Sequence, residues 1–387
     1  MKKICFVTTI SSTIKAFLID FAEYLVNQHG YEVFFICNTD NDLQNHLNEG
    51  MHYIPISMKR GISFDGIKAI MHMKKIFERE KFDIIQYATP NASLYASIAA
   101  KMVGTENRLY THWGSRYMGY KGGLERFIFK TLEKITCFNS TIIETESKSL
   151  LEYSVKDGLY PKEKSSVIWN GSACGVKLEN YNLENREIWC KKVREKYGIP
   201  MGAVVFGWCG RITKDKGHNE LFNAFRELNK TNKNARLLMV GPYDNIETIE
   251  KELFSWAQNC PEIIFTGPVP SDQVPVMYSA MDVFCSLSYR EGFGLVVIEA
   301  AAMMLPGIVT DCPGQIDTID PNVTGISVHD HDVDSVVEAM KFYIANPERM
   351  KAMGKEARKQ VEEKYDQKQL FKKLVQNRDK LIDVKKS

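Results

Sequence analysis

The stretch DVFCSLSYREGFGLVVIEAAAMMLPGIVTD (residues 282–311) decides the fold of the second half of this chain. A short apolar run leads into a charged, glycine-rich turn around Glu291, and a longer apolar run follows it up to Pro306. Strand, glycine turn, helix and strand in this order predict a βαβ unit. The acids Glu291 and Glu299 suggest general acid–base chemistry, whereas a glycine-rich turn that enters a helix suggests anion binding.

The same alternation extends along nearly the whole chain. KKICFVTT, EVFFICN, FDIIQYAT and RLYTHWG are expected strands of the first half, and KAFLIDFAEYLVNQHG and ASLYASIAAKMVG are expected helices. The pattern restarts after Gly171 with AVVFGWCGR, ARLLMVGP and IIFTGPV. Such continuous apolar strands are typical of parallel sheets that are covered on both faces. We therefore predict an α/β protein with two doubly wound, Rossmann-like domains.

The domain boundary is expected near residues 170–200, where a polar helical segment without an obvious strand separates the two patterns. We expect one domain at 1–175, a second at 176–365, and a carboxyl-terminal helix at 366–387 that returns to the first domain. Ligands of such folds bind beyond the carboxyl ends of the strands. Two facing domains of this kind predict a deep cleft between them.

Composition excludes several classes of protein. The chain has 387 residues, of which 44% are hydrophobic and 25% charged, and its formal net charge of +2 disfavours a dedicated nucleic-acid binder. Nine cysteines are scattered singly, which favours a reducing compartment, and no run is long enough to span a membrane. We expect a cytoplasmic protein. The opening MKKICFVTTISS imitates a signal peptide, but its short apolar run is better interpreted as a strand.

The loop CGRITKDKG lies between an expected strand and an expected helix. It places Arg211 and Lys216 beside a helix amino terminus, and Gly210 and Gly217 allow close approach of the backbone. The Arg guanidinium can bind a diphosphate with two parallel hydrogen bonds, and the Lys ammonium acts as a point charge. The helix dipole adds attraction for the anion. The alternative is an ordinary solvated loop.

The turn REGFGLVVIEA has the same strand-to-helix position. Glu299 falls about one turn into the helix, and Glu291 lies in the loop before it. Carboxylates accept hydrogen bonds from pairs of sugar hydroxyls, so one acid could hold a ribose and the other a hexose. Glu299 could instead be a first-turn acid that favours the helix dipole. Its apolar neighbours make an unpaired carboxylate costly there, and a ligand would remove that cost.

Several motifs in fixed order resemble one enzyme family. GR…K…KG, FTGPV, Y..MDVFCSLSYREGFGLVVIEAAA, GIVTDCPGQIDTI and NVTGISV resemble the carboxyl-terminal half of retaining glycosyltransferases with the GT-B fold, family 4. The resemblance covers nearly all of residues 203–330. FDIIQYATPNASLYASIAAKMVGTENRLYTHWGSRY in the first half also resembles bacterial enzymes that build capsule, O-antigen and lipid-linked glycans.

The resemblance implies a binding site for a nucleotide-sugar donor. Arg211 and Lys216 would neutralise the departing diphosphate, Glu299 would hold the ribose, Glu291 would contact the transferred sugar, and residues 267–269 would border the base, expected to be uracil. Arg211, Lys216 and Glu291 are the expected catalytic residues. The full expected set is Gly210, Arg211, Lys216, Gly267, Pro268, Val269, Glu291, Gly292, Phe293, Gly294, Leu295 and Glu299.

The acceptor side is expected in the first domain, where this chain departs from the family. Ser11, Ser12 and Thr13 replace a common glycine pair in the loop TTISSTIKAF, and Lys15 could compensate as a phosphate contact. Many relatives have a histidine just before the glycine of THWGSRY. Here His112 comes one residue earlier, so a packing histidine is an equal alternative.

The implied reaction is a transfer with retention of configuration. Breaking the sugar–diphosphate bond creates negative charge on the leaving group, which fixed cations and helix-end amides would stabilise. Glu291 and Glu299 imitate the acid pair of a glycosidase. The diphosphate needs no proton to leave, so we reject that assignment and expect neither a protein nucleophile nor a cofactor.

The stretch HDHDVDS (329–335) has the residue types of a metal site. Asp332 and Asp334 form a D-x-D pattern, and His329 and His331 enrich it. The alternative is a polar turn whose aspartates begin a helix. The position of the pattern, past the last expected strand, favours the helix start, so no metal is expected.

Membrane contact is a separate hypothesis. Arg126, Lys130 and Lys134 recur every four residues on the expected helix of RYMGYKGGLERFIFKTLEKITCF, with apolar residues on another side. A basic face with nearby aromatic residues is typical of a helix on anionic lipid. The alternative is an amphipathic helix that packs its apolar side on its own sheet.

We therefore expect a metal-independent, retaining transferase that moves a hexose or N-acetylhexosamine from a UDP-linked donor onto a saccharide acceptor. A polyprenyl diphosphate could carry this acceptor. The transferase could contact the inner face of the membrane peripherally. The alternatives are a nucleotide-sugar epimerase of the same fold, which explains the EGFG…E spacing less well, and a non-catalytic two-lobed sugar-binding protein, which needs an export signal.

Overall fold

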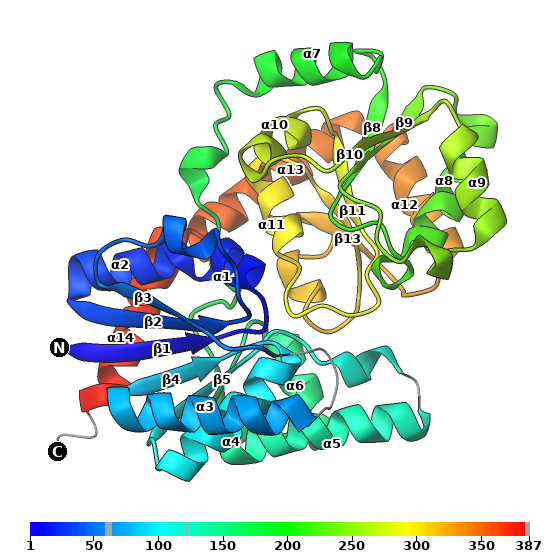
Figure 1. Ribbon diagram of the computed structural model, residues 1–387. Helices are drawn as coiled ribbons and strands as arrows, with labels where there is room; N and C mark the ends of the chain where they lie inside the picture. The colour runs from blue at the N-terminus through cyan, green and yellow to red at the C-terminus, as the bar shows by residue number, and fades with distance from the viewer. Residues whose placement is uncertain (59–63, 121, 384–387) are drawn as a thin grey trace. The chain divides into compact units, whose positions relative to one another are not determined.

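The computed structural model describes residues 1–58, 64–120 and 122–383. The chain forms two compact units. One comprises Met1–Cys174 with Lys368–Ser387, and the other comprises Gly175–Gln367. Each unit is a parallel sheet with helices on both faces (Figure 1). The structure thus confirms the predicted α/β fold with two Rossmann-like domains.

The described residues of the first unit form a seven-stranded parallel sheet in the order β3-β2-β1-β4-β5-β6-β7. Parallel strands that are buried on both faces need apolar residues at nearly every position, as the sequence has. The strands are β1 (Lys2–Val7), β2 (Tyr31–Cys37), β3 (Met51–Pro55), β4 (Ile84–Tyr87), β5 (Asn107–His112), β6 (Ile142–Thr145) and β7 (Ser165–Val167).

Helices cover both faces of this sheet. They are α1 (Ser11–Phe17), α2 (Ile19–His29), α3 (Phe64–Glu80), α4 (Pro90–Val103), α5 (Gly123–Asn139), α6 (Lys148–Lys156) and α14 (Gln367–Asp383). Side chains alternate along a strand, so Ile4 and Phe6 of β1 pack with α2 and α14 on one face. Cys5 and Val7 pack with α3 and α4 on the other face.

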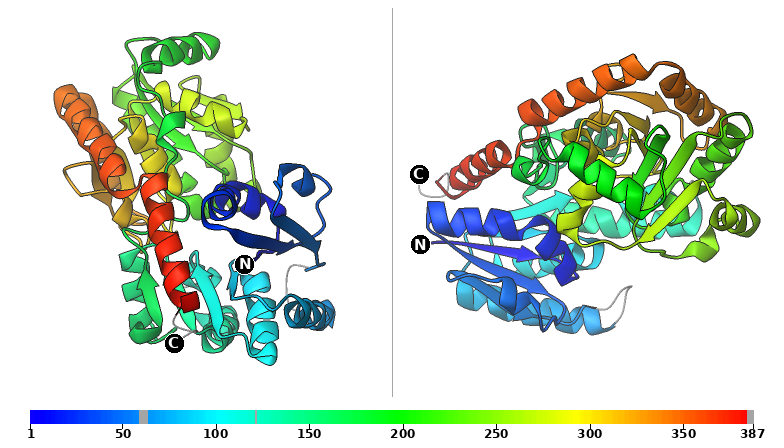
Figure 2. Two further views of the ribbon diagram at one scale, coloured as in Figure 1. Left: turned by 90° about the vertical axis from the view of Figure 1, so that its left-hand side faces the viewer. Right: turned by 90° about the horizontal axis from the view of Figure 1, so that it is seen from above.

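A buried arginine holds α14 in the first unit. Both terminal nitrogens of Arg378 bind the carboxylate of Glu144 on β6, at 2.6 and 2.7 Å, and one also contacts Gln86 of β4 at 3.2 Å. Arg378 is 1% exposed. Such a bidentate pair is strong when both partners stay, and a lone buried charge is costly. Figure 2 shows α14, in red, beside the strands of this unit.

The tail differs from the sequence-based expectation in one respect. The helical pattern of EEKYDQKQLFKKLVQNRDKLIDV (362–384) predicts one continuous helix, but α13 (Pro347–Lys364) ends inside this segment and α14 starts at Gln367. Between them the chain pairs with Val176, whose N–H donates to the carbonyl of Tyr365 at 2.8 Å and whose carbonyl accepts from Gln367 at 3.0 Å. These two hydrogen bonds require extended backbone, which interrupts the helix.

The described residues of the second unit form a six-stranded parallel sheet in the order β10-β9-β8-β11-β12-β13. The strands are β8 (Val204–Cys209), β9 (Ala235–Val240), β10 (Ile263–Gly267), β11 (Val283–Ser286), β12 (Gly307–Thr310) and β13 (Gly325–Val328). The helices are α7 (Arg186–Lys196), α8 (His218–Thr231), α9 (Lys251–Asn259), α10 (Val274–Ser279), α11 (Leu295–Ala302), α12 (Val333–Ala345) and α13.

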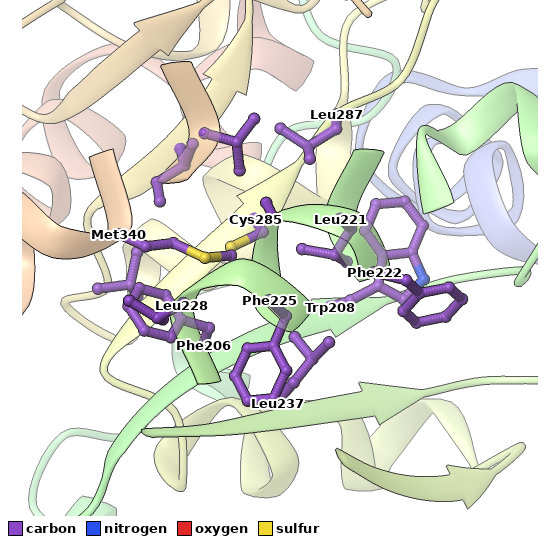
Figure 3. Packing of buried hydrophobic residues seen from close by; sticks show 14 of the residues in the cluster. Phe206, Trp208, Leu221, Phe222, Phe225, Leu228, Leu237, Cys285, Leu287 and Met340 are labelled. Carbon is purple, nitrogen blue, oxygen red and sulfur yellow. The ribbon is translucent and has the colours of Figure 1, made fainter. Parts of the chain in front are cut away.

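The second unit also has a core on each face of its sheet. Phe206 and Trp208 of β8 pack with α8, α9 and α12, and Figure 3 shows them gathered with Leu221 and Phe225 of α8. Val205 of the same strand packs on the opposite face with α7, α10, α11 and α13. This double cover fixes β8 and β11 at the centre of the sheet.

Both sheets reverse their strand order at one point. The chain builds the second sheet outward from β8 to β10, then returns so that β11 lies on the other side of β8. The first sheet does the same between β1 and β4. Loops diverge at such a switch point, and the crevice beyond the strand carboxyl ends is where these folds bind ligands.

Candidate functional site

The loops that follow β8 and β11 touch each other at the switch point of the second sheet. Gly217 closes the first loop with φ +74°, and a Cβ there would lie 2.0 Å from the carbonyl oxygen of Leu287. No other residue permits that approach. The N–H of Tyr289 also donates to the carbonyl of Asp215 at 3.1 Å. The structure thus brings together the two loops that carry the expected catalytic residues.

Lys216 and Glu291 form an ion pair across these loops. The hydroxyl of Ser288 donates to the same oxygen of Glu291 at 2.8 Å. The side chains of Lys216 and Glu291 are only 21% and 18% exposed, so water screens their charges weakly. A cation and a carboxylate are thereby held at the carboxyl ends of two adjacent strands, where a phosphate or a hydroxyl can replace one partner.

Arg211 has a different partner. Its guanidinium binds the carboxylate of Asp244, which follows β9, and its side chain is 57% exposed. Arg211 therefore lies on the expected loop, but it pairs toward β9 and not with Glu291. Asp244 was not predicted, because no local spacing connects it to a loop 33 residues earlier.

Glu299 lies in the middle of α11 and is not left unpaired. The hydroxyl of Tyr278, from α10, donates to its carboxylate at 3.2 Å. Burial raises the pKa of Glu299 to about 7, although Tyr278 and Tyr181 lower it in part. The sequence predicts a ligand as the partner of this buried acid, and the structure adds a protein hydroxyl that contributes without one.

A second loop holds the glycine-rich turn in place. The amide of Gln315 donates to the carbonyl of Ser286 and to the hydroxyl of Thr310, which in turn donates to the carbonyl of Ser288 at 2.7 Å. A Cβ on Gly314 would lie 2.4 Å from the carbonyl oxygen of Glu291. The CPGQ segment (312–315) is thus the support for the turn, a role that sequence reasoning did not assign.

The predicted turn residues Gly292, Phe293, Gly294 and Leu295 lead directly into α11. Gly294 is the residue before the helix, and Leu295 is its first residue. The Phe293 side chain is buried against Tyr365, with 5.2 Å between the ring centroids. This anchor fixes the backbone of the turn and turns the Phe293 ring into the core, so that the main-chain groups of the turn lead into the start of the helix.

His218 was also missed. It is fully buried, and its Nδ1 lies 2.6 Å from the carbonyl oxygen of Thr213, to which it donates as a neutral ring. Burial lowers the pKa of His218 to about 4, so the ring is uncharged at neutral pH. It ties the start of α8 to the loop that carries Lys216. The available signal was its position directly after Gly217.

A cluster of three side chains, which we call the clasp, joins the site loops to α8. The carboxylate of Glu220 accepts from the Tyr289 hydroxyl at 2.6 Å and contacts Nδ1 of His331 at 3.1 Å. The rings of Tyr289 and His331 lie 4.0 Å apart. Tyr289 comes two residues before Glu291, so the clasp restrains the loop that holds this acid.

The residues expected near the base lie at the same edge of the sheet. The N–H of Gly210 donates to the carbonyl of Val240 at 2.9 Å, and Gly267 ends β10 and accepts from Gly241 at 3.0 Å. Pro268 follows and is exposed. Val269 packs against the core cluster that includes Tyr278.

The expected acceptor loop of the first unit is bound by carboxylates of the same unit. Ser11 donates to Asp40, and the Lys15 ammonium lies 3.1 Å from Asp40 and 2.7 Å from Asp42. Ser12 and Thr13 continue in α1. Hydrogen bonds from Ser11, the Asp42 backbone and Lys15 hold the pKa of Asp40 well below its usual range. Lys15 thus has two carboxylate partners within its own unit.

His112 lies in the core of the first unit. It is 0% exposed, and its ring nitrogens contact the hydroxyls of Tyr160 at 3.1 Å and Ser115 at 2.6 Å. Burial lowers the pKa of His112 to about 3. The structure therefore places it as a neutral packing histidine.

The D-x-D pattern forms a helix start, as its position indicated. The side chain of Asp332 accepts from the N–H of Ser335 at 3.0 Å and so caps α12. Asp334 lies in the first turn of the helix. His329 pairs with Asp311, and His331 belongs to the clasp. Among the described residues, no group of three or more metal-ligating side chains is placed to hold a metal ion.

The hypothesis of a basic membrane face on α5 needs correction. Arg126 and Lys130 both bind Asp157, at 3.1 and 2.9 Å, and each side chain is 22% exposed. Arg126 also lies over the ring of Tyr117. Only Lys134 of the three is exposed. The alternative, packing on its own unit, holds in part: Phe129 and Cys137 of α5 pack in the core of the first unit, whereas several other apolar residues of α5 face outward. No described helix has the length and hydropathy needed to cross a bilayer.

Each of the two units matches a family of known proteins. Residues 3–147 match the family described as Glycosyl transferase 4-like, and residues 191–360 match Glycosyl transferases group 1. The capsular polysaccharide biosynthesis glycosyltransferase CapM of Staphylococcus aureus is 32% identical over 345 residues, which is 89% of this chain and 88% of CapM.

The chain belongs to the group 1 glycosyltransferases. This glycosyltransferase is also 21% identical, over 94% of its length and 91% of the relative's, to the UDP-Gal:alpha-D-GlcNAc-diphosphoundecaprenol alpha-1,3-galactosyltransferase of Escherichia coli. The crystal structure of Anabaena Alr3699/HepE in complex with UDP superposes with a TM-score of 0.77, 16% identity, and coverage of 97% and 99% of the two chains. The resemblance to GT-B glycosyltransferases is thereby confirmed.

Proposed function

We propose that this glycosyltransferase transfers a hexose or N-acetylhexosamine from a UDP-linked donor, with retention of configuration, to a saccharide carried on a polyprenyl diphosphate. The contact between Lys216 and Glu291 at the switch point of the second sheet carries the donor half of the proposal. It joins one cation and one carboxylate on two loops that both point into the crevice where such sheets bind ligands.

Each part of the donor has a chemically suited partner. Lys216, helped by Arg211, faces the diphosphate; Glu291 accepts from hydroxyls of the transferred sugar; and Glu299, behind the turn, accepts from the two ribose hydroxyls. Donor binding replaces the Lys216–Glu291 and Arg211–Asp244 pairs with contacts to phosphate, so the free protein's ion pairs keep both cations oriented until the ligand arrives.

The transfer step then follows from charge. The bond between the anomeric carbon and the phosphate oxygen breaks, and Lys216 and the amides at the start of α11 stabilise the negative charge on departing UDP. The acceptor hydroxyl attacks the anomeric carbon on the face that UDP leaves, and its proton passes to the departing phosphate oxygen. With the donor bound, Glu291 is held by Ser288 and by hydroxyls of the transferred sugar, and Glu299 by Tyr278 and the ribose hydroxyls, so neither carboxylate acts as a nucleophile.

The choice of UDP and of a lipid-linked acceptor rests on two relatives. The Anabaena structure of the same fold was solved with UDP, and the E. coli relative acts on a diphosphoundecaprenol-linked sugar. CapM is a glycosyltransferase of capsular polysaccharide biosynthesis, and we assign the present chain to the same kind of surface-glycan assembly. A polyprenyl carrier lies in a membrane, so the enzyme would work at its inner surface.

We further propose that the reaction needs no metal ion, because Lys216 and Arg211 supply the positive charge that a metal would bring to the diphosphate. EDTA at about 5 mM exceeds any trace metal in the assay and removes it. The turnover rate with EDTA should equal the turnover rate without it. A loss that Mn²⁺ or Mg²⁺ restores would contradict this part of the proposal.

The test of function has two steps. A thermal-shift screen of UDP-, GDP- and ADP-sugars identifies the donor, which should raise the melting temperature by mass action. The best donor is then incubated with polyprenyl-diphosphate-linked saccharides, and the anomeric configuration of the product is read by NMR. We expect UDP release that requires acceptor and a product with the donor's configuration. Conversion of the donor without acceptor would support the epimerase alternative and overturn the proposal.

A further inference from the structure

The helix α5 has its hydrophobic side turned outward. Leu124, Phe127 and Phe138 are 73%, 67% and 73% exposed, and Ile128 and Ile135 are each 38% exposed. Phe127 and Ile128 come three and four residues after Leu124, Ile135 comes seven after Ile128, and Phe138 comes three after Ile135, so all five lie on one face of the helix. We call this set the α5 stripe.

The inward side of the same helix is partly polar. Glu133, Thr136 and Asn139 are buried among the first unit's side chains. The Tyr110 hydroxyl donates to the Glu133 carboxylate, and burial raises the pKa of this acid to about 7. A surface helix ordinarily places its apolar residues toward the core and its charges toward water. Here the arrangement is partly reversed, which a solitary soluble domain would not need.

The α5 stripe extends nearly the whole length of the helix. Leu124 and Phe138 are fourteen residues apart, which is about 21 Å at the rise of an α-helix. Met102, on the neighbouring helix α4, adds a further large apolar side chain that is 51% exposed. Several large apolar side chains exposed on one helix face are typical of an interaction site. Figure 1 shows α5 as an outer helix of its unit, with α4 between it and α3.

The charges beside the stripe select the kind of partner. The ammonium of Lys101 lies 4.0 Å from the centre of the Phe138 ring, and Lys134 is exposed next to Ile135. A lysine whose stem lies along an apolar side chain while its charge stays outside suits the boundary between lipid tails and anionic headgroups. Arg126 and Lys130 do not take part, since Asp157 neutralises them.

We propose that the α5 stripe is a membrane-insertion surface, which dips its apolar side chains into the interface of an anionic bilayer with Lys101 and Lys134 at the headgroup level. The proposal deepens the proposed function, on which it rests, because a lipid-linked acceptor places the reaction at a membrane. Insertion of the α5 stripe would be driven by burial of apolar side chains, whereas binding through a basic face would be driven by attraction between charges. Apolar insertion should persist in salt that screens charges, whereas attraction between exposed charges should not.

The test uses the full-length chain and vesicles of phosphatidylcholine with phosphatidylglycerol. Phe127→Ser with Phe138→Ser removes two of the most exposed side chains of the stripe. Ile67→Ser with Met71→Ser is the matched control, because these residues are exposed at 60% and 42% on α3 of the same unit. Co-sedimentation is measured at low salt and in 0.5 M NaCl, chosen as a concentration at which the screening length is roughly 4 Å.

We expect the unchanged protein and the control to bind vesicles in both salts, and the stripe variant to lose at least tenfold in partition. Equal binding of the stripe variant and the unchanged protein would overturn the proposal, as would binding that vanishes in 0.5 M NaCl. A concentration-dependent dimer that Phe127→Ser with Phe138→Ser dissociates would assign the stripe to a second copy of the chain and overturn it as well.

A second readout separates this inference from the proposed function. With a short-chain acceptor that dissolves in water, the stripe variant should transfer sugar at the unchanged rate, whereas with acceptor in vesicles its rate should fall in step with partition. Equal loss with both acceptors would show a structural defect and contradict the surface role. Absence of transfer by the unchanged protein, with vesicle binding intact, would reject the proposed function and leave the insertion surface standing.

Discussion

The two units share one topology but carry different chemistry at their switch points. In the second unit, the loops after the central strands carry Lys216 and Glu291, which pair with each other. In the first unit, the corresponding loops after β1 and β4 meet through hydroxyls, since Thr9 Oγ1 lies 2.8 Å from Thr89 Oγ1. Lys15 nearby is bound by Asp40 and Asp42.

The comparison teaches that the fold provides the place for a site and the loops provide the chemistry. A diphosphate needs fixed positive charge, which the second unit offers at its switch point. Under the proposed function, the acceptor hydroxyl is neutral and needs only hydrogen-bonding groups, and the first unit has such groups at its own switch point.

The largest effect is expected at Lys216. Lys216→Ala should lower kcat/KM by about 10²- to 10³-fold, because it removes a fixed cation from the developing charge of the leaving group. Steady-state kinetics with the best UDP-sugar measure this, and the melting temperature serves as the control for folding. A loss below about fivefold would remove Lys216 from catalysis.

Arg378→Ala should mainly affect the stability of the first unit. Removing this side chain leaves Glu144 buried without its cation, which should lower the free energy of unfolding by about 3 kcal/mol. Urea unfolding, followed with probes in each unit, is the measurement. UDP affinity should stay unchanged, since the pair lies outside the second unit. A parallel loss of UDP affinity would contradict the assignment of donor binding to the second unit alone.

Glu299 should give donor binding a pH dependence. Its folded-state pKa of about 7 lies above the ordinary value of 4.5, so the folded free protein favours the protonated acid. Stability from this group is present at low pH and is lost as pH rises from about 4.5 to about 7. Ribose hydroxyls prefer the carboxylate, so UDP should bind more tightly at pH 8 than at pH 6 by about three- to tenfold.

Calorimetric titration of UDP at both pH values, on the natural protein and on Glu299→Gln, tests this prediction. The amide variant cannot ionise, so its UDP affinity should be weaker and nearly independent of pH. Its free energy of unfolding at pH 8 should exceed that of the natural protein by about 1–2 kcal/mol. The same pH dependence in both proteins would assign the titration to another group.

The clasp should have a smaller effect on turnover. Tyr289→Phe removes the hydroxyl that Glu220 holds and should lower kcat by about threefold to tenfold with little change in donor KM, because Glu291 loses restraint but not its chemistry. His331→Ala should lower kcat by a smaller factor than Tyr289→Phe. A pure loss of stability, without any change in kcat for the folded fraction, would make the clasp structural only.

The smallest effect is expected at Lys15. Because two carboxylates of its own unit already bind it, Lys15→Ala should change kcat/KM by less than about threefold. The assay is the one used for Lys216→Ala, and the pair of variants compares an equal loss of charge in the two units. A large loss at Lys15 would mean that the acceptor's diphosphate displaces Asp40 and Asp42, and the contrast would fail.

Sequence patterns predicted the fold because its causes are local. Apolar runs of strand length, helical stretches and glycine turns each follow from short-range periodicity, and their alternation determines the architecture. The loops with Lys216 and Glu291 were predictable for the same reason, since each lies between a strand and a helix. The break between α13 and α14 was not, because it depends on pairing with Val176, almost two hundred residues away.

The rest of the site depends on contacts between distant segments. Asp244, Tyr278 and Gln315 lie near the site only after the sheet has formed, and no spacing in the sequence reveals them. The orientation of α5 was mispredicted for a related reason. Helical periodicity separates its basic and apolar sides correctly, but it cannot show that Asp157 draws Arg126 and Lys130 inward.

We propose that the donor nucleotide binds at the switch point of the second unit. A crystal structure of the protein with UDP would show whether it does. We expect the diphosphate within hydrogen-bonding distance of Lys216 and the amides that begin α11, with the ribose hydroxyls on Glu299. UDP bound elsewhere, with the ion pair of Lys216 and Glu291 intact, would contradict the account.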